Sequence, residues 1–305
     1  MSIIQSTTHT PNPIRSTSPF SRFVSEFCES RLAVIGLLFL VMIILIAIFA
    51  PALSPQNPYD LSQIDIMDGR LAPGEKSFDG ITYYLGTDDQ GRDMLSAIFY
   101  GLRISLGVGV MSGFVALLIG LTVGLISGYF GGKIDSVIMR IVDILLGFPA
   151  ILIALILLAI LGRGVDKVVI ALVASQWVYF ARTVRSTALV ERQKEYIEAA
   201  DCLALGTWRI LLRHLLPNCL PPVIVVATVE VANAIALEAT LSFLGIGLPI
   251  TEPSLGLLIS NGYEYMLSGK YWISFFPGIA LLITITSINL VADQLREILN
   301  PRLKK

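Results

Sequence analysis

Six long apolar stretches alternate with polar segments along this chain. They cover residues 32–50, 104–127, 134–161, 168–184, 223–244 and 272–292. A helix rises about 1.5 Å per residue, so crossing the roughly 30 Å hydrocarbon core of a bilayer takes about twenty apolar residues. The stretches lack the strict alternation of barrel strands, whereas a helix satisfies its own backbone in lipid. The pattern therefore predicts an all-α polytopic membrane protein with six transmembrane helices.

The first apolar stretch ends at Ala50-Pro51-Ala52, which resembles a signal-peptide cleavage site. The apolar core of a signal peptide spans only about 7–15 residues, however, and residues 32–50 form a longer run. We therefore expect the first stretch to remain in the protein as a transmembrane helix.

The composition is typical of the same class of protein. Of the 305 residues 54% are hydrophobic and 15% are charged, whereas soluble domains carry about 25% charged residues. The net charge of -1, with no basic cluster, excludes a nucleic-acid footprint. Cys28, Cys202, Cys219, His9 and His214 lack metal-ligand spacing. We expect neither a metal site, a disulfide framework nor catalytic residues.

Lys and Arg are unevenly distributed between the two sides that the six stretches define. Most of the 22 Lys and Arg residues lie on the side of the two termini. Because cytoplasmic segments are enriched in these residues, we expect both termini in the cytoplasm. The predicted segments are a cytoplasmic N-terminal tail (1–31), a first transmembrane helix (32–50), an outer loop (51–103), a membrane core (104–293) and a cytoplasmic C-terminal tail (294–305).

The segment at residues 194–218 is polar, although apolar stretches flank it on both sides. Glu195, Glu198 and Asp201 recur every three residues, so they share one face of a predicted helix and leave small side chains elsewhere on it. The segment is longer than most connections between helices. It is either a solvated helical hairpin or, as we expect from its length, a docking surface for another protein.

A second helix is predicted in the latter half of this polar segment. Thr207 is a candidate N-cap after the Leu205–Thr207 break, and Arg209 and Arg213 lie one turn apart. We expect Pro217 to end this helix, because proline removes a backbone donor and clashes with the preceding turn. Acids on the first helix and bases on the second favour a paired arrangement.

Two acids interrupt the fifth apolar stretch. Glu230 and Glu238 are eight residues apart with Asn233 between them, and the stretch holds no Lys or Arg. Charges inside a membrane are costly and mark functional positions. Three explanations remain open: the acids pair with another subunit, they are protonated, or they line a pathway, in which an acid suits the amino terminus of a peptide.

The second and third stretches carry further signals. Gly120, Gly124 and Gly128 recur every four residues, a spacing that lets helices approach closely, within the chain or between subunits. In the third stretch we expect a local ion pair between Arg140 and Asp143, and a kink or a backbone opening at Pro149.

Part of the polar segment resembles the EAA loop of bacterial ABC importer permeases. The matching positions are Glu198, Ala199, Ala200, Leu216 and Pro217. The family pattern has a glycine where this chain has Ala204 and an apolar residue where it has His214; Gly206, two residues on, is a second candidate for the turn. In the family this loop is a short helix that sits in a groove of a cytoplasmic ATPase, so the resemblance implies that contact here.

A second motif is similar to the signature of the dipeptide, oligopeptide and nickel permeases within that family. The family pattern is LGTDxxGRDxxSRxxxGxRxSL, and the chain reads LGTDDQGRDMLSAIFYGLRISLGVG from Leu85, with Ala97 in place of arginine. Taken alone, the residues suggest turn glycines and helix caps. The motif either starts the second helix or contacts a periplasmic binding protein. The candidate residues are Gly86, Thr87, Asp88, Gly91, Arg92 and Asp93.

The chain lacks the GxxxxGK[ST] pattern of a P-loop. With the resemblance, which covers residues 31–305, this implies a permease subunit of the type I ABC importer fold in the bacterial inner membrane. It implies no cofactor in this chain, with ATP and Mg held by two cytoplasmic ATPase subunits. The other implied partners are a homologous second permease subunit, a periplasmic or lipid-anchored binding protein and membrane lipid.

The resemblance implies import of dipeptides or oligopeptides by alternating access. Import of nickel or glutathione by a permease of the same fold remains an alternative. A protein of another class, a secondary transporter or channel driven by an ion gradient, would use Glu230 and Glu238 as proton or cation sites. Such transporters often contain internal repeats, and we find none in this sequence.

Overall fold

The computed structural model describes residues 19–77 and 80–299, and within them the regular elements are helices plus two isolated β-bridges. The elements are α1 (Pro19–Glu29), α2 (Arg31–Leu53), η1 (Leu61–Gln63), η2 (Ile66–Asp68), α3 (Met94–Phe130), α4 (Gly132–Leu146), α5 (Ala150–Leu161), α6 (Val165–Glu191), α7 (Glu195–Cys202), α8 (Thr207–Arg209), the π-helix η3 (Ile210–Leu215), α9 (Leu216–Phe243), α10 (Leu255–Tyr263), η4 (Met266–Ser268) and α11 (Trp272–Leu299). The predicted all-α class is confirmed.

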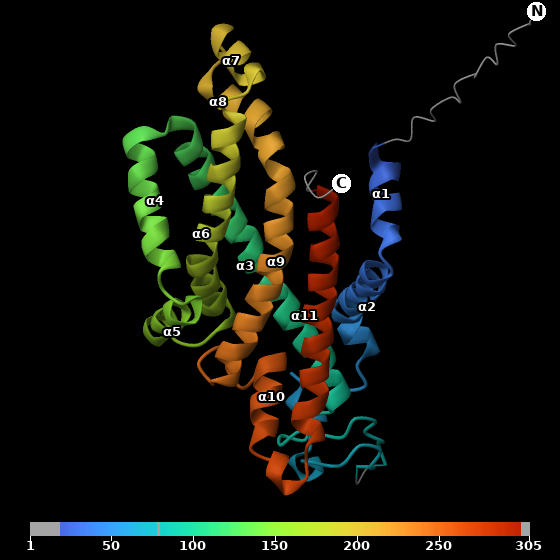
Figure 1. Cartoon of the computed structure of the whole chain (residues 1–305). Helices are drawn as coiled ribbons and strands as arrows, with labels where there is room; N and C mark the ends of the chain where they lie inside the picture. The colour runs from blue at the N-terminus through green and yellow to red at the C-terminus, as the bar shows by residue number, and fades with distance from the viewer. Residues whose placement is uncertain (1–18, 78–79, 300–305) are drawn as a thin grey trace, which may run out of the picture.

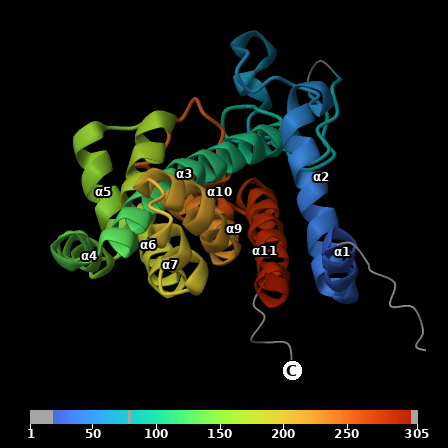
Figure 2. The ribbon, with the colours of Figure 1, turned by 90° about the horizontal axis from the view of Figure 1, so that it is seen from above.

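The long helices run between two ends of the molecule (Figure 1). α7 and α8 project at one end, and α10 lies at the other together with the loop that precedes α3. The C-terminal end of α11 points toward the α7 end. Seen along the bundle, α4 and α5 lie on one flank and α1 and α2 on the other, with α3 between them (Figure 2).

Among the residues that the structure describes, five helices are long and apolar enough to cross a membrane: α2, α3, α6, the continuous helix Thr207–Phe243, and α11. The third apolar stretch, residues 134–161, is not one straight span, because α4 and α5 meet at an angle of 89°. Pro149 stands directly before α5 with φ -57° and ψ 129°. This extended backbone turns the chain, so the proline predicted to kink the stretch breaks it in two.

Two predicted boundaries are wrong because helices continue through them. α3 begins at Met94, so the expected break between residues 103 and 104 falls inside it; no proline interrupts the residues that follow. Pro217 does not end the second helix of the polar segment, since helix runs from Thr207 to Phe243. The π-helical turn η3 lies just before this proline. Its hydrogen bonds span five residues instead of four, and they occur beside the position where Pro217 has no backbone N–H to donate.

The predicted tails are partly helical. α1 lies within the predicted N-terminal tail, and α11 extends beyond residue 294 to Leu299. The remainder of both predicted tails, residues 1–18 and 300–305, lies outside the described residues. Gln294 donates a hydrogen bond to the backbone oxygen of Glu26 at 3.1 Å, which ties the end of α11 to α1.

The acids of α4 pair with α6 rather than with their own helix. Arg182 donates to Asp143 at 2.5 Å, so the predicted local pair of Asp143 with Arg140 is wrong. Arg185 donates to Asp135, which also accepts from Ser127 of α3. Arg140 and Asp143 are neighbours on α4 because of the helix spacing. Since α4 packs against α6, however, Arg182 is the partner of Asp143.

Three glycines let α3 approach α6 closely within this chain. A Cβ atom added to Gly120 would lie 2.3 Å from the Cβ of Phe180. One added to Gly124 would lie 2.7 Å from the Cβ of Val184, and one added to Gly128 would lie 2.7 Å from the Cβ of Ala188. Since real carbon atoms do not approach this closely, only glycine fits. The predicted close packing is confirmed, and its partner is α6.

We predict that Gly124→Leu lowers the free energy of unfolding by about 1–3 kcal/mol, because the larger side chain overpacks the α3–α6 contact. Thermal unfolding of the purified chain in detergent measures the change. Gly107→Leu is the matched control, since a Cβ atom added to Gly107 of the same helix would meet no atom within 4 Å. Equal shifts for the two variants would show that the contact does not limit stability.

Candidate functional site: an exposed loop and a polar cavity

α7 and α8 form a loop that extends past the ends of α6 and α9 (Figure 1). Its inner side is apolar: Ile197 and Ala200 are buried against Ile210, with Leu205 and Tyr129 packed around them. The Glu198-Ala199-Ala200 motif is therefore divided. Glu198 and Ala199 are exposed, whereas Ala200 is 4% exposed and holds α7 onto the base of the loop.

The outer side of this loop carries large apolar side chains that sequence reasoning missed. Leu203 is 74% exposed, Trp208 68% and Leu212 56%. Trp208 and Leu212 are one helical turn apart and so share a face. The sequence did contain a signal for this surface, namely large apolar residues within an otherwise polar segment. Their exposure at an end of the molecule, beside Glu198 and Ala199, is typical of a surface that binds another protein.

The turn after α7 is closed by Ala204. Its amide donates to the Asp201 oxygen at 2.9 Å, and the amide of Leu205 donates to the Ala200 oxygen at 3.2 Å, the pair of bonds that defines a Schellman motif. Ala204 has φ +51°, a left-handed backbone that favours glycine. Gly206 does not take over the turn, since its φ is -60°. The turn of the family pattern thus forms here without its glycine.

The two ends of the loop are fixed to the long helices. Glu191, the last residue of α6, accepts hydrogen bonds from Lys194 at 2.6 Å and from the Tyr196 hydroxyl at 2.7 Å. Burial and the hydrogen bond to Glu191 raise the pKa of Tyr196 to about 12. At the other end Leu216 is half-buried in the core between α3, α6 and α9, and Pro217 is exposed at the start of α9. Thr207 is not an N-cap; Gly206 holds that position.

The motif at residues 86–93 lies at the opposite end, and its six signature residues are buried, whereas Asp89 and Gln90 between them are half-buried. Arg92, 2% exposed, donates to the fully buried Asp88 at 2.6 Å. Thr87 donates to the backbone oxygen of Asp68 at 2.5 Å and accepts from the amide of Leu71 at 2.8 Å, rather than capping a helix. Burial and the neighbouring Asp88 carboxylate raise the pKa of Asp89.

This buried motif connects the loop to two long helices. Asp93 caps α3 by accepting from the Ser96 amide at 2.9 Å, as predicted. Gly86 and Gly91 have φ +78° and +81°, so both are turn formers as predicted. The indole of Trp272 in α11 donates to the Thr87 oxygen at 3.3 Å. All six signature residues therefore pack inward and do not present side chains to a partner.

The acids of α9 lie in two different surroundings. Glu238 is fully buried, and its carboxylate accepts from Ser105 and Ser242, each at 2.8 Å. Glu230 instead lines a cavity of about 400 Å³ together with Asn233 and Gln176. The structure thus separates two residues that the sequence places on one broad face, and it adds Gln176 of α6, which only tertiary packing reveals.

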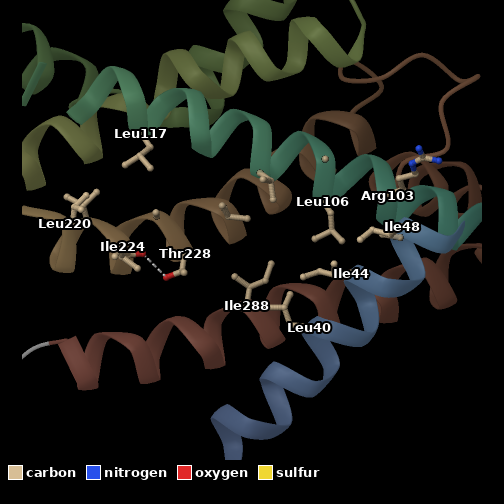
Figure 3. A pocket seen from close by; sticks show the side chains of 16 residues that line it. Leu40, Ile44, Ile48, Arg103, Leu106, Leu117, Leu220, Ile224, Thr228 and Ile288 are labelled. Atoms are coloured by element: carbon tan, nitrogen blue, oxygen red, sulfur yellow. Dashed lines mark hydrogen bonds between the residues drawn. The ribbon is translucent and has the colours of Figure 1, made fainter. Parts of the chain in front are cut away.

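A larger cavity of about 710 Å³ lies between α2, α3, α9 and α11 (Figure 3). Its walls are aliphatic side chains such as Leu40, Leu106 and Ile288, with Arg103 at one end and Thr228 bonded to its own helix. Such a lining suits hydrocarbon rather than a charged solute. Within the described residues no group of three His, Cys, Asp or Glu side chains is placed to hold a metal ion.

We predict that Ala204→Gly stabilises the loop by about 0.5–1 kcal/mol, because glycine relieves the left-handed backbone. Trypsin cleaves residues 192–213 when the loop opens locally, so cleavage of this variant should be about two- to fivefold slower. Ala199→Gly is the matched control and should have the opposite effect, since Ala199 lies inside α7. Faster cleavage of the Ala204→Gly variant would contradict the strained turn.

Comparison with known proteins places these features in a family. The model described as "Binding-protein-dependent transport system inner membrane component" matches residues 120–305. The model described as "N-terminal TM domain of oligopeptide transport permease C" matches residues 18–73.

Several relatives match over nearly the whole chain. The dipeptide transport system permease protein DppC of Escherichia coli is 39% identical over 94% of this chain and 95% of its own length. The oligopeptide transport system permease protein OppC of Bacillus subtilis is 37% identical over 95% of this chain and 92% of its own length. A putative peptide transport system permease protein of Brucella suis is 36% identical over 100% of this chain and 99% of its own length.

Among solved structures, inward-facing forms of the MetNI methionine ABC transporter have a similar fold. The TM-score is 0.56 at 24% identity, over 67% of this chain and 97% of the other. The fold is thus that of a type I ABC importer permease. The chain belongs to the inner-membrane components of binding-protein-dependent transport systems, in the dipeptide and oligopeptide permease group, and is a multi-pass membrane transport protein rather than an enzyme.

Proposed function

We propose that this chain is one of two permease subunits of an ATP-driven importer of dipeptides or oligopeptides, and that α7 and α8 dock into a cytoplasmic ATPase subunit. The observation that carries the docking role is the exposed outer side of the loop, where Leu203 and Trp208 lie in the open beside Glu198. Peptide import is supported by the names of the relatives.

The loop is built to pass movement on to the membrane helices. Only residues 192–194 separate α6 from α7, and a single turn separates α7 from the continuous helix that includes α9. Displacement of α7 by a closing ATPase would therefore act on α6 and α9 together. Such coupling requires contacts that differ between the inward- and outward-facing states, and the cavity beside Glu230 lies between these same helices.

The complex requires further partners. Two ATPase subunits hold ATP and Mg, since this chain has no P-loop. A homologous second permease subunit completes the pathway, and a periplasmic or lipid-anchored binding protein delivers the peptide. Because the six signature residues between positions 86 and 93 are buried, this protein would meet other parts of the same loop, such as Ile66 and Met67, which are 80% and 87% exposed.

In this proposal the α7 end faces the cytoplasm, together with α1 and the end of α11. The exposed thiol of Cys202 tests it. In a Cys28→Ser background, a membrane-impermeant maleimide should label Cys202 in inverted vesicles and leave it unlabelled in right-side-out vesicles; Cys219 is buried.

Met67→Cys is the control for this labelling experiment, because it places a thiol on the opposite end of the molecule, at a position that is 87% exposed. Its labelling should have the reverse dependence on vesicle orientation. Labelling of Cys202 from outside intact cells would overturn the proposed orientation and with it the ATPase contact.

For docking itself, we predict that Glu198→Arg combined with Trp208→Ala reduces ATPase co-purification about tenfold or more, because interface anchors of this kind contribute about 1 kcal/mol or more each. Ala200 is unsuitable for this test, since it is buried and its replacement would unfold the loop. Glu264→Arg is the matched charge reversal, at an exposed position of the other end. Full ATPase retention by the double variant would show that the loop is not the docking site.

A further inference from the structure

The cavity beside Glu230 lies between α5, α6 and α9 and has a volume of about 400 Å³, within the usual range for a small-ligand site. Its walls combine polar groups with small apolar ones. The lining includes Gln176, Glu230, Asn233, Ala236, Leu237 and Thr240.

One donor of each amide and threonine side chain in this lining already has a partner inside the protein. The Gln176 amide donates to the backbone oxygen of Glu230 at 3.1 Å. The Asn233 amide donates to the Glu230 carboxylate at 3.3 Å, and the Thr240 hydroxyl donates to the oxygen of Ala236 at 2.7 Å. Besides the second N–H of each amide and the Tyr179 hydroxyl, which also lines the cavity, the lining leaves acceptor oxygens for a ligand.

One of these acceptors is buried without any partner. Gln176 is 3% exposed, and its side-chain oxygen makes no hydrogen bond in the structure. Buried polar atoms without partners cost free energy and call for an explanation. The carboxylate of Glu230, 6% exposed, has only the long bond from Asn233. No Lys, Arg or His is present in the lining.

A ligand that donates several hydrogen bonds and carries positive charge matches the Gln176 oxygen and the Glu230 carboxylate. A protonated amine has both properties, because an ammonium group offers three donors and no acceptor. Glu238 offers a contrast on the same helix, since two serines occupy its carboxylate and it is not part of the cavity. Of the two acids, only Glu230 is available to a ligand.

We infer that this cavity binds the protonated α-amino group of the transported peptide, with Glu230 and the Gln176 oxygen as acceptors. The inference rests on the proposed import of peptides and names a binding site for them in this subunit. Ala236 and Leu237 supply apolar wall beside these acceptors for the first side chain of the peptide.

The test measures equilibrium binding to the purified complex of the full-length chain with its permease and ATPase partners, without the binding protein. The two probes are forms of the same short alanyl peptide, which carries a fluorophore at its carboxyl end. One form has a free amino terminus and the other is N-acetylated. We expect the free-amine form to bind about tenfold tighter or more to the native complex. Glu230→Gln should abolish this preference, and Glu238→Gln should keep it.

Gln176→Met provides a second variant, which removes the unpartnered oxygen and preserves volume; it should weaken the preference without affecting assembly. Equal binding of the two peptides to the native complex, or an intact preference in Glu230→Gln, would overturn the inference. So would loss of the second permease subunit from Glu230→Gln, because Glu230 would then be an intersubunit partner.

A separate measurement distinguishes failure of this inference from failure of the proposed function. Native complex reconstituted with its binding protein should import the free peptide when supplied with ATP. Absence of import there would overturn the proposed function and this inference with it. Import together with a lost amine preference would overturn the amine site alone.

Discussion

The close contact between α3 and α6 connects the two ends of the molecule. α3 starts in the buried motif where Asp93 caps it, and α6 ends at Glu191, which holds the base of the exposed loop. Between these points Gly120, Gly124 and Gly128 bring the two backbones together without intervening side chains. In a bilayer, where helices gain little from leaving lipid, such packing supplies much of the association energy. The loop and the cavity therefore have a common rigid support.

The two ends of this helix pair differ in whether their polar groups are buried or exposed. At the end of the buried motif, Arg92 and Asp88 pair inside the protein, while Asp93 caps α3 and the Trp272 indole of α11 donates to the Thr87 oxygen. At the α7 end, polar residues such as Glu198 remain outside, next to the exposed Trp208. A buried ion pair fixes an arrangement, whereas an exposed mixed surface is available to a partner. In the proposed orientation this difference corresponds to a stable outer cap and a moving contact with the cytoplasmic ATPase.

Features set by local periodicity could be predicted from the sequence, and features set by tertiary packing could not. Apolar length located the spans, and the four-residue glycine spacing predicted a close contact. The sequence also indicated that Pro149 disturbs a helix, but it did not indicate the size of the bend, which is 89°. The helix continues through Pro217 because a π-helical turn precedes it, which no local pattern indicates. The pairing of Asp143 with Arg182 and the position of Gln176 in the cavity depend on neighbours distant in sequence.

In the proposed function, ATP hydrolysis by partner subunits drives peptide import through this chain. The most direct measurement is uptake of a radiolabelled peptide into proteoliposomes that contain the complete complex and its binding protein, with ATP or a proton gradient imposed separately. We expect uptake to require ATP on the α7 side and to persist when an uncoupler collapses the proton gradient. Uptake that continues without ATP and stops with the uncoupler would contradict it, and would instead favour a secondary transporter driven by an ion gradient.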